Sequence, residues 1–572
     1  MKKYLLLVLI ATSGCQKLDP EFLTVTSKEQ IVTNFENMEG MLSSLYTDLP
    51  DGLYNIWGGN GAALMAAATD EAEYTYETNP VQYFNTGSWN AAVNPDDAWA
   101  KYNRAIRKVN QFLEDKGKID FSRWKDDPER QEVYKQNLDK SIRWEYEARF
   151  LRAFYYFELV KRYGGVPILT HSLSLNEDFS AIKRNTLEEC IDFIVQECDT
   201  AALHLPLDAS MFPYVLANDL GRVTKLSALA LKSRVLIYAA SELFNNTSWS
   251  GGYAKSELIS MPIGNRSERW RAASNVAKEI IDLTSGITFA SYRNLFTTNV
   301  FDAPEIFLCR RYPSTNSFEQ YNYPVGIYNG QGGTNPSQNL VDAYEVKVDE
   351  NTSRDFDWSN PAMANNPYEN RDPRLELSVI VNNATFGNPA RNVEIWNDGR
   401  DAPPLQNATK TGYYIKKYVH ELNLNTGGSA VHGWIIFRLS EIFLNYAEAL
   451  NEYSPGHPDI KIYYDKVRSR SDVNMPGLPD GLTQSEIREK IRQEKRVEFA
   501  FEDHRFWDVR RWMMGEILGA DLRGVRVSKS GNNFLYMPFV VESRIFLPKM
   551  YLYPIPQSDI NINGNLDQNP MW

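Results

Sequence analysis

The sequence predicts a mostly α fold, in which helix pairs alternate with long inserts and a few short strands. Two observations carry this prediction. Apolar residues recur with the helical period in several separate segments, and capping boxes open some of them. Between these segments lie long inserts, at about 50–96 and 284–430, which are rich in Gly, Asn, Pro, Tyr and Trp and have no helical period. Loops of that length are usually functional, so we expect the inserts to bind ligand.

Composition sets bounds on the class of protein. The chain has 572 residues, of which 43% are hydrophobic and 23% are charged, so it can bury a large core. Because its net charge is -12 and it has no basic stripe, we expect no nucleic acid among its partners. The aromatic share of 13%, with 32 Tyr, 27 Phe and 13 Trp, exceeds what a core alone requires.

The clearest helix is predicted over 144–163. Its aromatic and leucine residues form two adjacent rows, which make a wide apolar stripe. Gly164-Gly165 ends this helix, and Pro167 prevents its restart. A capping box at Thr186–Glu189 then opens a second helix, which we expect to end near residue 205. These two helices form one antiparallel pair.

Further segments follow the same pattern, and we predict four irregular TPR-like helix pairs in all. Insertions separate them, because the spacing is not a fixed 34 residues and the usual TPR sequence pattern is missing. A last helix group runs from the capping box Thr483–Glu486 to Trp512. The remaining predicted pairs are 31–46 with 97–114, 224–243 with 270–283, and 437–452 with 460–470.

The chain is predicted to fold as one unit. Near the C-terminus, residues 533–555 are rich in aromatic and β-branched residues and indicate one or two strands. No flexible linker divides the chain, so we expect residues 31–572 to form a single domain after a short tether.

The N-terminus predicts export and a lipid anchor. Two Lys follow Met1, and an apolar run of eight residues leads to small residues before Cys15. A bilayer span needs roughly 20 apolar residues, so we interpret residues 1–14 as a signal peptide. The segment is similar to a bacterial lipoprotein box, which implies that Cys15 carries the lipid, palmitate included, and that residues 15–30 form a lipidated tether. Soluble secretion with an incidental Cys is the alternative.

Three more cysteines lie further along the chain. Eight residues along one predicted helix put Cys190 and Cys198 about 12 Å apart, which is beyond the reach of a disulfide. Their spacing also fits no zinc site. We therefore predict that Cys190, Cys198 and Cys309 are buried free thiols.

Four segments, in order along nearly the whole chain, carry a resemblance to a known family. They are EARFLRAFYYFELVKRYGGVP (147–167), FRLSEIFLNYAEALNE (437–452), IRQEKRVEFAFEDHRFWDVRRW (491–512) and YLYPIPQSDININGNLDQNP (551–570). All four resemble SusD/RagB proteins, the surface nutrient-binding lipoproteins of Bacteroidetes. The CQKLDPEFL stretch that begins at Cys15 is similar to the start of mature members.

The resemblance implies a SusD-like fold, with four TPR-like helix pairs packed against a loop-rich portion. It also implies a location on the surface of the outer membrane and a SusC-like TonB-dependent transporter as partner. The lipoprotein would act as a lid over the barrel of that transporter. The usual cargo of the family is a glycan, although the RagB branch handles peptides.

No catalytic or metal-binding motif is present in the sequence. It has no G-x-S-x-G elbow, no H-E-x-x-H, no Walker loop and no G-x-G-x-x-G, and its six His lack ligand spacing. We predict no catalytic residue, no metal ligand and no cofactor; a structural calcium ion in a loop is not readable from sequence. The charged run from Glu494 to Arg511 is interpreted as an ion-pair network that holds the last helices, with a catalytic cluster as the alternative.

Sugar binding requires aromatic rings on loops beside amide or carboxylate groups, because pyranose rings present flat C–H faces edged with hydroxyls. Two regions fit, residues 54–99 and residues 312–344. Likeness to SusD proteins implies that an acidic residue, matching Asp70, and a downstream Trp, matching Trp89, join the binding platform. The candidate ligand-binding residues are Trp57, Asp70, Tyr76, Trp89, Tyr312, Tyr321 and Tyr323.

The leading hypothesis is a non-enzymatic lipoprotein of the cell outer membrane that binds oligosaccharide and delivers it to a SusC-like TonB-dependent transporter. A second hypothesis keeps the same arrangement but makes the cargo a peptide, as in RagB-type proteins. A carbohydrate-active hydrolase of helical fold and a TPR-type adaptor with protein partners only are the other two hypotheses.

Overall fold

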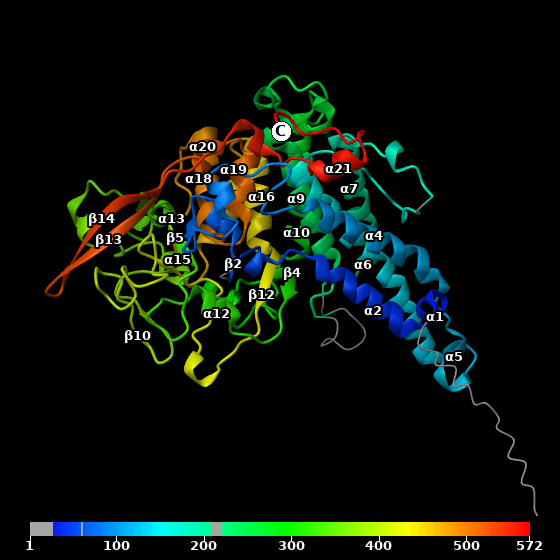
Figure 1. The fold of residues 1–572 in the computed structure, drawn as a ribbon, viewed down its shortest axis with the longest axis horizontal. Helices are drawn as coiled ribbons and strands as arrows, with labels where there is room; N and C mark the ends of the chain where they lie inside the picture. Colours follow the sequence, from blue (N-terminus) through cyan, green and yellow to red (C-terminus); the bar gives the residue numbers. More distant parts are fainter. Residues whose placement is uncertain (1–26, 59–60, 175, 209, 211–219) are drawn as a thin grey trace, which may run out of the picture.

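Helices build one part of the molecule, and loops with short strands build the other (Figure 1). The computed structural model describes residues 27–58, 61–174, 176–208, 210 and 220–572. The predicted signal peptide, the predicted lipid site Cys15 and most of the predicted tether therefore lie outside the described residues. The prediction of a mostly α fold is confirmed.

A continuous stack of helices makes the α portion, and each helix packs against the next in sequence order. The members of the stack are α2 (Phe35–Leu45), α4 (Trp99–Asp115), α6 (Gln131–Tyr163), α7 (Leu187–His204), α9 (Lys225–Ala240), α10 (Arg266–Leu283) and α16 (Leu439–Tyr453). Helices α17 (Asp459–Arg468) and α18 (Gln484–Glu498) both pack on α16, and the short α1 (Lys28–Thr33) precedes α2. The predicted pairs are thus neighbours in one stack.

Local sequence signals predict some helix ends correctly and others incorrectly. Helix α7 begins at the predicted capping box, in which the Thr186 side chain accepts from Glu189 N and the Glu189 side chain accepts from Thr186 N. Helix α6, in contrast, begins at Gln131, well before the predicted start at Trp144. Residues 131–140 are all exposed or half-buried, so they carry no apolar period that could have revealed the extension.

The last predicted helix group is two helices. A turn over residues 499–503 separates α18 from α19 (His504–Arg511), and Phe501 and Asp503 each adopt a φ of 63° there. Non-glycine residues seldom occupy this left-handed region, so the surroundings must hold the turn in place.

Short antiparallel strand pairs tie the loop-rich portion together. Strand β4 (Ile306–Arg311) pairs with β12 (Gly433–Arg438), which leads directly into α16. Strand β3 (Ala72–Tyr74) pairs with β5 (Thr334–Pro336), so the two predicted inserts lie side by side. All residues of these two strands are buried, so the inserts join in the interior.

A long hairpin projects from this portion (Figure 1). Its strands are β13 (Leu522–Ser530) and β14 (Asn533–Glu542), in antiparallel register. The prediction of one or two strands within 533–555 is confirmed by one strand, β14. The partner strand lies before 533 instead, in a segment where charged and small residues mask the alternation.

A buried ion-pair network holds α18 in the core. Glu498 is fully buried, with its Oε1 2.6 Å from Arg438 Nη1 and its Oε2 2.8 Å from Arg374 Nη1. Burial alone would raise the pKa of Glu498, but Arg438 and Arg374 outweigh it and hold the pKa well below its ordinary value. Lys417 and Arg438 both bind Glu502, one turn further on. The predicted ion-pair network is therefore present around Glu498 and Glu502.

The remaining predictions for the core concern the thiols. Cys190, Cys198 and Cys309 are free and buried, as predicted. Burial raises the pKa of the Cys190 thiol to about 12, so it stays protonated and behaves as a small apolar side chain.

Across the part of the chain that the structure describes, no helix has both the length and the hydropathy needed to cross a bilayer.

Removing one partner of the buried network should destabilise the fold. We expect Glu498→Gln to lower the free energy of unfolding by about 3–5 kcal/mol, because it leaves Arg438 and Arg374 with one uncompensated charge in the core. Urea denaturation followed by circular dichroism measures this. The matched control is Glu268→Gln on α10, which breaks an exposed ion pair with Arg271 and should cost about 0–1 kcal/mol. Equal losses in the two variants would contradict the argument.

Candidate ligand-binding site

An exposed tryptophan marks the candidate site. Strand β1 (Ile56–Gly58) pairs with β2 (Gly61–Ala63), and successive side chains of a strand point to opposite sides. Ile56 therefore enters the core, where 2% of it is exposed, while 58% of Trp57 is exposed. An indole that is exposed in this way presents a large flat apolar area to solvent.

Trp57 belongs to a cluster of four aromatic rings, which we call the aromatic platform. The rings are Tyr54, Trp57, Tyr312 and Tyr321. Tyr54 and Trp57 are stacked, with ring centroids 5.7 Å apart and planes at 16°. Tyr321 meets Trp57 edge-on at 6.4 Å, and Tyr312 meets Tyr54 edge-on at 5.7 Å. Two rings from each predicted region thus meet here, with Tyr54 itself buried and Trp57 the most exposed of the four.

Close packing of backbone against a ring places Tyr321. It lies on α12 (Ser317–Asn322), facing Gly61 at the start of β2. A Cβ at Gly61 would lie only 2.9 Å from Tyr321 Cδ1, and Gly61 has a φ of +112°. Both facts favour glycine here, because it lacks a Cβ and tolerates positive φ.

Polar groups border the platform on one side. Tyr312 donates its hydroxyl hydrogen bond to Asp51 Oδ1 at 2.6 Å. Burial and the Asp51 carboxylate both raise the pKa of Tyr312 above its ordinary value, so the hydroxyl remains a donor. The Arg310 guanidinium lies 5.4 Å from the centre of the Tyr312 ring and 3.8 Å from Asp51 Oδ2. A ligand on the platform therefore meets both donors and acceptors at this edge.

A cavity of about 220 Å³ continues from this edge into the protein. Asp51 and Asn55 line it together with Lys101 and Asp503. Asn55 Nδ2 donates to Asp503 Oδ2 at 2.6 Å, while Asp503 Oδ1 has no hydrogen-bond partner. Burial raises the pKa of Asp503 to about 7.

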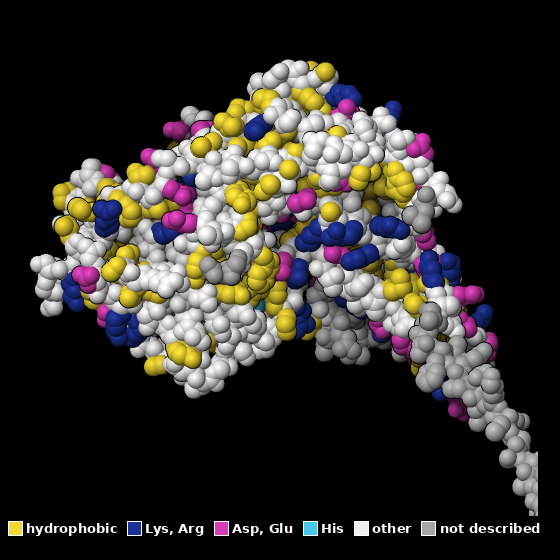
Figure 2. Space-filling model, in the orientation of Figure 1, with side chains coloured by type: hydrophobic (Ala, Val, Ile, Leu, Met, Phe, Trp, Pro, Cys, Tyr) yellow, Lys and Arg dark blue, Asp and Glu magenta, His cyan; other side chains and the backbone are white. Residues whose placement is uncertain are grey.

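The surface around the site is mixed in character. Figure 2 shows hydrophobic side chains gathered near the place where Figure 1 draws β2 and β12, with Lys and Arg side chains beside them over α4. The charges flank the apolar area and do not cover it.

The structure does not support Trp89 as a platform residue. Only 2% of it is exposed, and its ring packs against Phe84, Tyr553 and Trp572 at centroid distances of 5.2, 5.1 and 4.7 Å. A ring enclosed on these sides has no free face for a sugar. Two of these three partners come from the C-terminal end of the chain, which no local pattern around Trp89 could reveal.

Three other predicted residues lie off the platform. Tyr323 is fully buried, and its hydroxyl donates to the carbonyl of His420. Asp70 is buried in ion pairs with Arg496 and Arg505, described below. Tyr76 is half-buried, with its hydroxyl 3.3 Å from Gln331 Oε1. Of the seven candidates, the platform itself brings together Trp57, Tyr312 and Tyr321.

Sequence reasoning missed two groups at the site. Tyr54 begins the predicted region 54–99 but is not one of the seven candidates, and its spacing of three residues from Trp57 is the signal that indicates it. Asp51 lies just outside that region. Its partner, Tyr312, lies far along the chain, so nothing near Asp51 in the sequence indicates the contact.

Among the described residues, no group of three or more His, Cys, Asp or Glu side chains is placed to hold a metal ion. The platform therefore offers stacking surfaces and hydrogen-bonding groups, but no metal ligands within that part of the chain.

Two family models match the chain. One, described as "SusD family", matches residues 310–572, and one described as "Starch-binding associating with outer membrane" matches residues 21–237. The chain belongs to the SusD/RagB family. The two matches cover both halves of the aromatic platform, since Tyr54 and Trp57 fall in the second range and Tyr312 and Tyr321 in the first.

Individual SusD-like proteins agree over nearly the whole length. SusD-like protein P2 of Formosa agariphila is 20% identical, over 100% of this chain and 99% of its own. A SusD-like protein of Bacteroides fragilis has a TM-score of 0.76 and 26% identity, over 96% of this chain and 99% of its own. A SusD-like carbohydrate binding protein of the same species has a TM-score of 0.75 and 24% identity, over 94% of this chain and all of its own.

The buried acid pair Asp70–Glu71 connects the first insert of this SusD/RagB chain to its last helices. Asp70 lies 2.6 Å from Arg496 and 2.8 Å from Arg505. Burial would raise the pKa of Asp70, but the two arginines outweigh it and lower the pKa. For Glu71, burial and the neighbouring Asp70 charge raise the pKa to about 8, and its Oε1 has no hydrogen-bond partner. Asp70 thus fixes structure, with its two carboxylate oxygens held by Arg496 and Arg505.

Glu71 should make the stability depend on pH. Its pKa in the folded state, about 8, is above the unfolded value of 4.5, so folding takes up a proton between these pH values and stability falls as pH rises through this window. We expect Glu71→Gln to remove this fall and to be more stable than the parent at about pH 9 by at least 1 kcal/mol. Urea denaturation across the pH range tests this, with the exposed-site variant Glu77→Gln as control. Parallel stability curves for parent and Glu71→Gln would contradict it.

Proposed function

We propose that this protein binds oligosaccharide at the cell surface and delivers it to a SusC-like TonB-dependent outer-membrane transporter. The observation that carries the proposal is the aromatic platform, in which the exposed face of Trp57 stands among rings from two distant segments. The family model described as "Starch-binding associating with outer membrane" supports it.

Stacking supplies the attraction for a sugar. Aromatic rings bury a large apolar area and accept the flat C–H face of a pyranose, while hydroxyls at the ring edge need hydrogen-bonding partners. Asp51 and Arg310 lie beside Tyr312 and supply an acceptor and a donor. The adjacent cavity can accommodate one end of the oligosaccharide.

Peptide cargo, as in the RagB branch, is the second candidate. Tyrosine-rich surfaces also bind peptides, so the platform alone does not separate the two cargo classes. The matched family model is one of starch-binding proteins, and the similar Bacteroides fragilis protein is a carbohydrate binding protein, so both favour glycan.

The proposed role is binding without catalysis. A glycosidase needs two free carboxyl groups flanking the bond to be broken. At the platform, Asp51 is already engaged by Tyr312 and Arg310, and Asp503 in the adjoining cavity accepts a hydrogen bond from Asn55. We therefore expect oligosaccharide to be recovered unchanged after incubation, and a ladder of shorter products would revive the hydrolase hypothesis.

Loss of the exposed indole should weaken binding. We expect Trp57→Ala to lower the affinity for the bound oligosaccharide at least tenfold, or about 1.4 kcal/mol, because the main stacking face is removed. Isothermal titration calorimetry against panels of glycans and of peptides measures it. Tyr453→Ala, which removes an exposed ring elsewhere, is the control and should leave the affinity unchanged. Equal affinity of Trp57→Ala and parent for every bound glycan would contradict the proposal, and binding only of peptides would favour the second candidate.

We further propose that the protein is held at the outer membrane by lipid on Cys15. The lipoprotein-like sequence before Cys15 supports this, and acyl chains contribute about 0.8 kcal/mol per buried CH₂ to membrane binding. We expect metabolic labelling with palmitate to mark the parent protein and not Cys15→Ala, which should leave the membrane fraction. Labelling of the Cys15→Ala variant would contradict the anchor.

A further inference from the structure

A pocket lined by arginines lies at the end of strand β4, next to the aromatic platform. It has a volume of about 330 Å³, and Arg222, Arg310 and Arg311 are among its lining residues. No Asp or Glu side chain of the described residues lines it. We call it the arginine pocket. Its lining is basic, although the whole chain has a net charge of -12.

Arg310 connects the arginine pocket to the platform. Together with Arg311 it ends β4, just before Tyr312, and its guanidinium lies 5.4 Å from the centre of the Tyr312 ring. From Tyr312, two further ring contacts of 5.7 Å each lead through Tyr54 to the exposed Trp57. A ligand that lies on the indole and extends past Tyr312 therefore reaches the arginines.

Arg311 is the least neutralised of the three arginines. It is exposed, and its guanidinium lies 4.5 Å from the centre of the Phe301 ring. That guanidinium makes no hydrogen bond and no ion pair with any described residue. Its N–H donors are therefore available to a ligand that enters from solvent.

The other two arginines have carboxylate partners at unequal distances. Arg222 Nη1 lies 3.0 Å from Glu147 Oε2. Arg310 is half-buried, and its Nη2 lies 3.8 Å from Asp51 Oδ2, which is long for an ion pair. Asp51 lines the cavity beside the platform and not the arginine pocket. Arg310 and Arg311 thus supply positive charge that the lining of the pocket does not neutralise.

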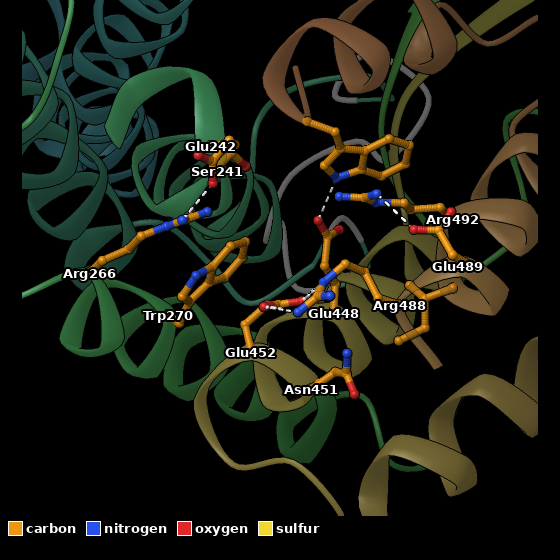
Figure 3. A pocket seen from close by; sticks show the side chains of 12 residues that line it. Ser241, Glu242, Arg266, Trp270, Glu448, Asn451, Glu452, Arg488, Glu489 and Arg492 are labelled. Atoms are coloured by element: carbon orange, nitrogen blue, oxygen red, sulfur yellow. Dashed lines mark hydrogen bonds and ion pairs between the residues drawn. The ribbon is translucent and has the colours of Figure 1, made fainter. Parts of the chain in front are cut away.

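The cavity between α10, α16 and α18 provides a comparison within the same protein. Its arginines point toward carboxylates of the same wall (Figure 3). The ion pairs are Arg266 with Glu242 at 2.6 Å, Arg488 with Glu452 at 2.5 Å and Arg492 with Glu489 at 2.9 Å. An anion that entered there would have to displace a carboxylate. In the arginine pocket, no carboxylate of the described lining competes with it.

We propose that the arginine pocket binds an anionic substituent of the oligosaccharide, so that the cargo of this protein is an acidic glycan. This inference rests on the proposed function, because it requires the sugar chain to lie on the platform. A guanidinium presents parallel N–H donors, which match a group that carries two or more negatively charged oxygens. A sulfate ester and a uronate carboxylate share this chemistry.

The test compares oligosaccharides that differ in charge. Calorimetry with the full chain uses oligosaccharides of galactose, glucose, mannose and xylose, each with and without uronate or sulfate groups. At about 50 mM NaCl, we expect an acidic form to bind at least tenfold more tightly than its neutral counterpart. The preference should shrink at about 500 mM NaCl, because salt screens exposed charges. A larger gain from sulfate or from uronate identifies which of the two anions the pocket takes.

Variants then assign the preference to the pocket. Arg311→Gln removes an exposed charge whose ring contact, Phe301, is not part of the platform, and it should reduce the preference for the acidic form at least threefold. Arg311→Lys keeps the charge and should retain more of the preference. The control is Arg354→Gln, which removes an exposed arginine of β7 (Ser353–Arg354) and should leave the preference unchanged.

The outcomes separate this inference from the proposed function. Equal affinity for neutral and acidic forms, or the same preference in the parent and in Arg311→Gln, would overturn the inference while the proposed function stands. Absence of binding to every form would instead contradict the proposed function, and the inference with it. Trp57→Ala should weaken the binding of neutral and acidic forms alike, because both use the platform.

Discussion

The buried carboxylates of α18 and of the turn after it hold the rest of the structure together. Glu498 joins Arg374 and Arg438 in the core, and Glu502 joins Arg438 and Lys417. Arg438 is the last residue of β12, so this network fixes the strand that pairs with β4. Tyr312 of the platform follows directly after β4. One set of charges therefore determines where one half of the site lies.

The same turn also positions the other half. Asp503 follows Glu502 and accepts a hydrogen bond from Asn55, which lies between Tyr54 and Trp57 in the sequence. The left-handed φ of Phe501 and Asp503 is a conformation that isolated chain seldom adopts, so it persists only because the neighbouring ion pairs and packing over-determine it. A local irregularity in the last helix group is thus coupled to the placement of the exposed indole.

Burying charge in a core costs desolvation free energy, and here the buried charges serve to fix geometry. Replacing buried ion pairs with apolar residues of similar volume is often neutral or stabilising, because desolvation offsets the attraction between the charges. Directional contacts from a guanidinium, however, constrain angles that apolar packing leaves loose. In this chain the arginines link helices to loops that have little regular structure of their own. We infer that the network gives the loop-rich portion one defined arrangement.

Sequence alone determined most helices of the stack, some of their ends and the two inserts that carry the platform, because apolar period, capping boxes and Gly or Pro breaks act over a few residues. It also selected Trp57, Tyr312 and Tyr321. It did not separate Trp57 from Trp89, since both stand in the same insert among similar neighbours. Tertiary structure decided that difference: Tyr553 and Trp572, from the other end of the chain, cover Trp89, while the pairing of β1 with β2 turns Trp57 outward. Whether a ring is buried depends on residues that are distant in the sequence, so the composition of its own loop does not predict its exposure.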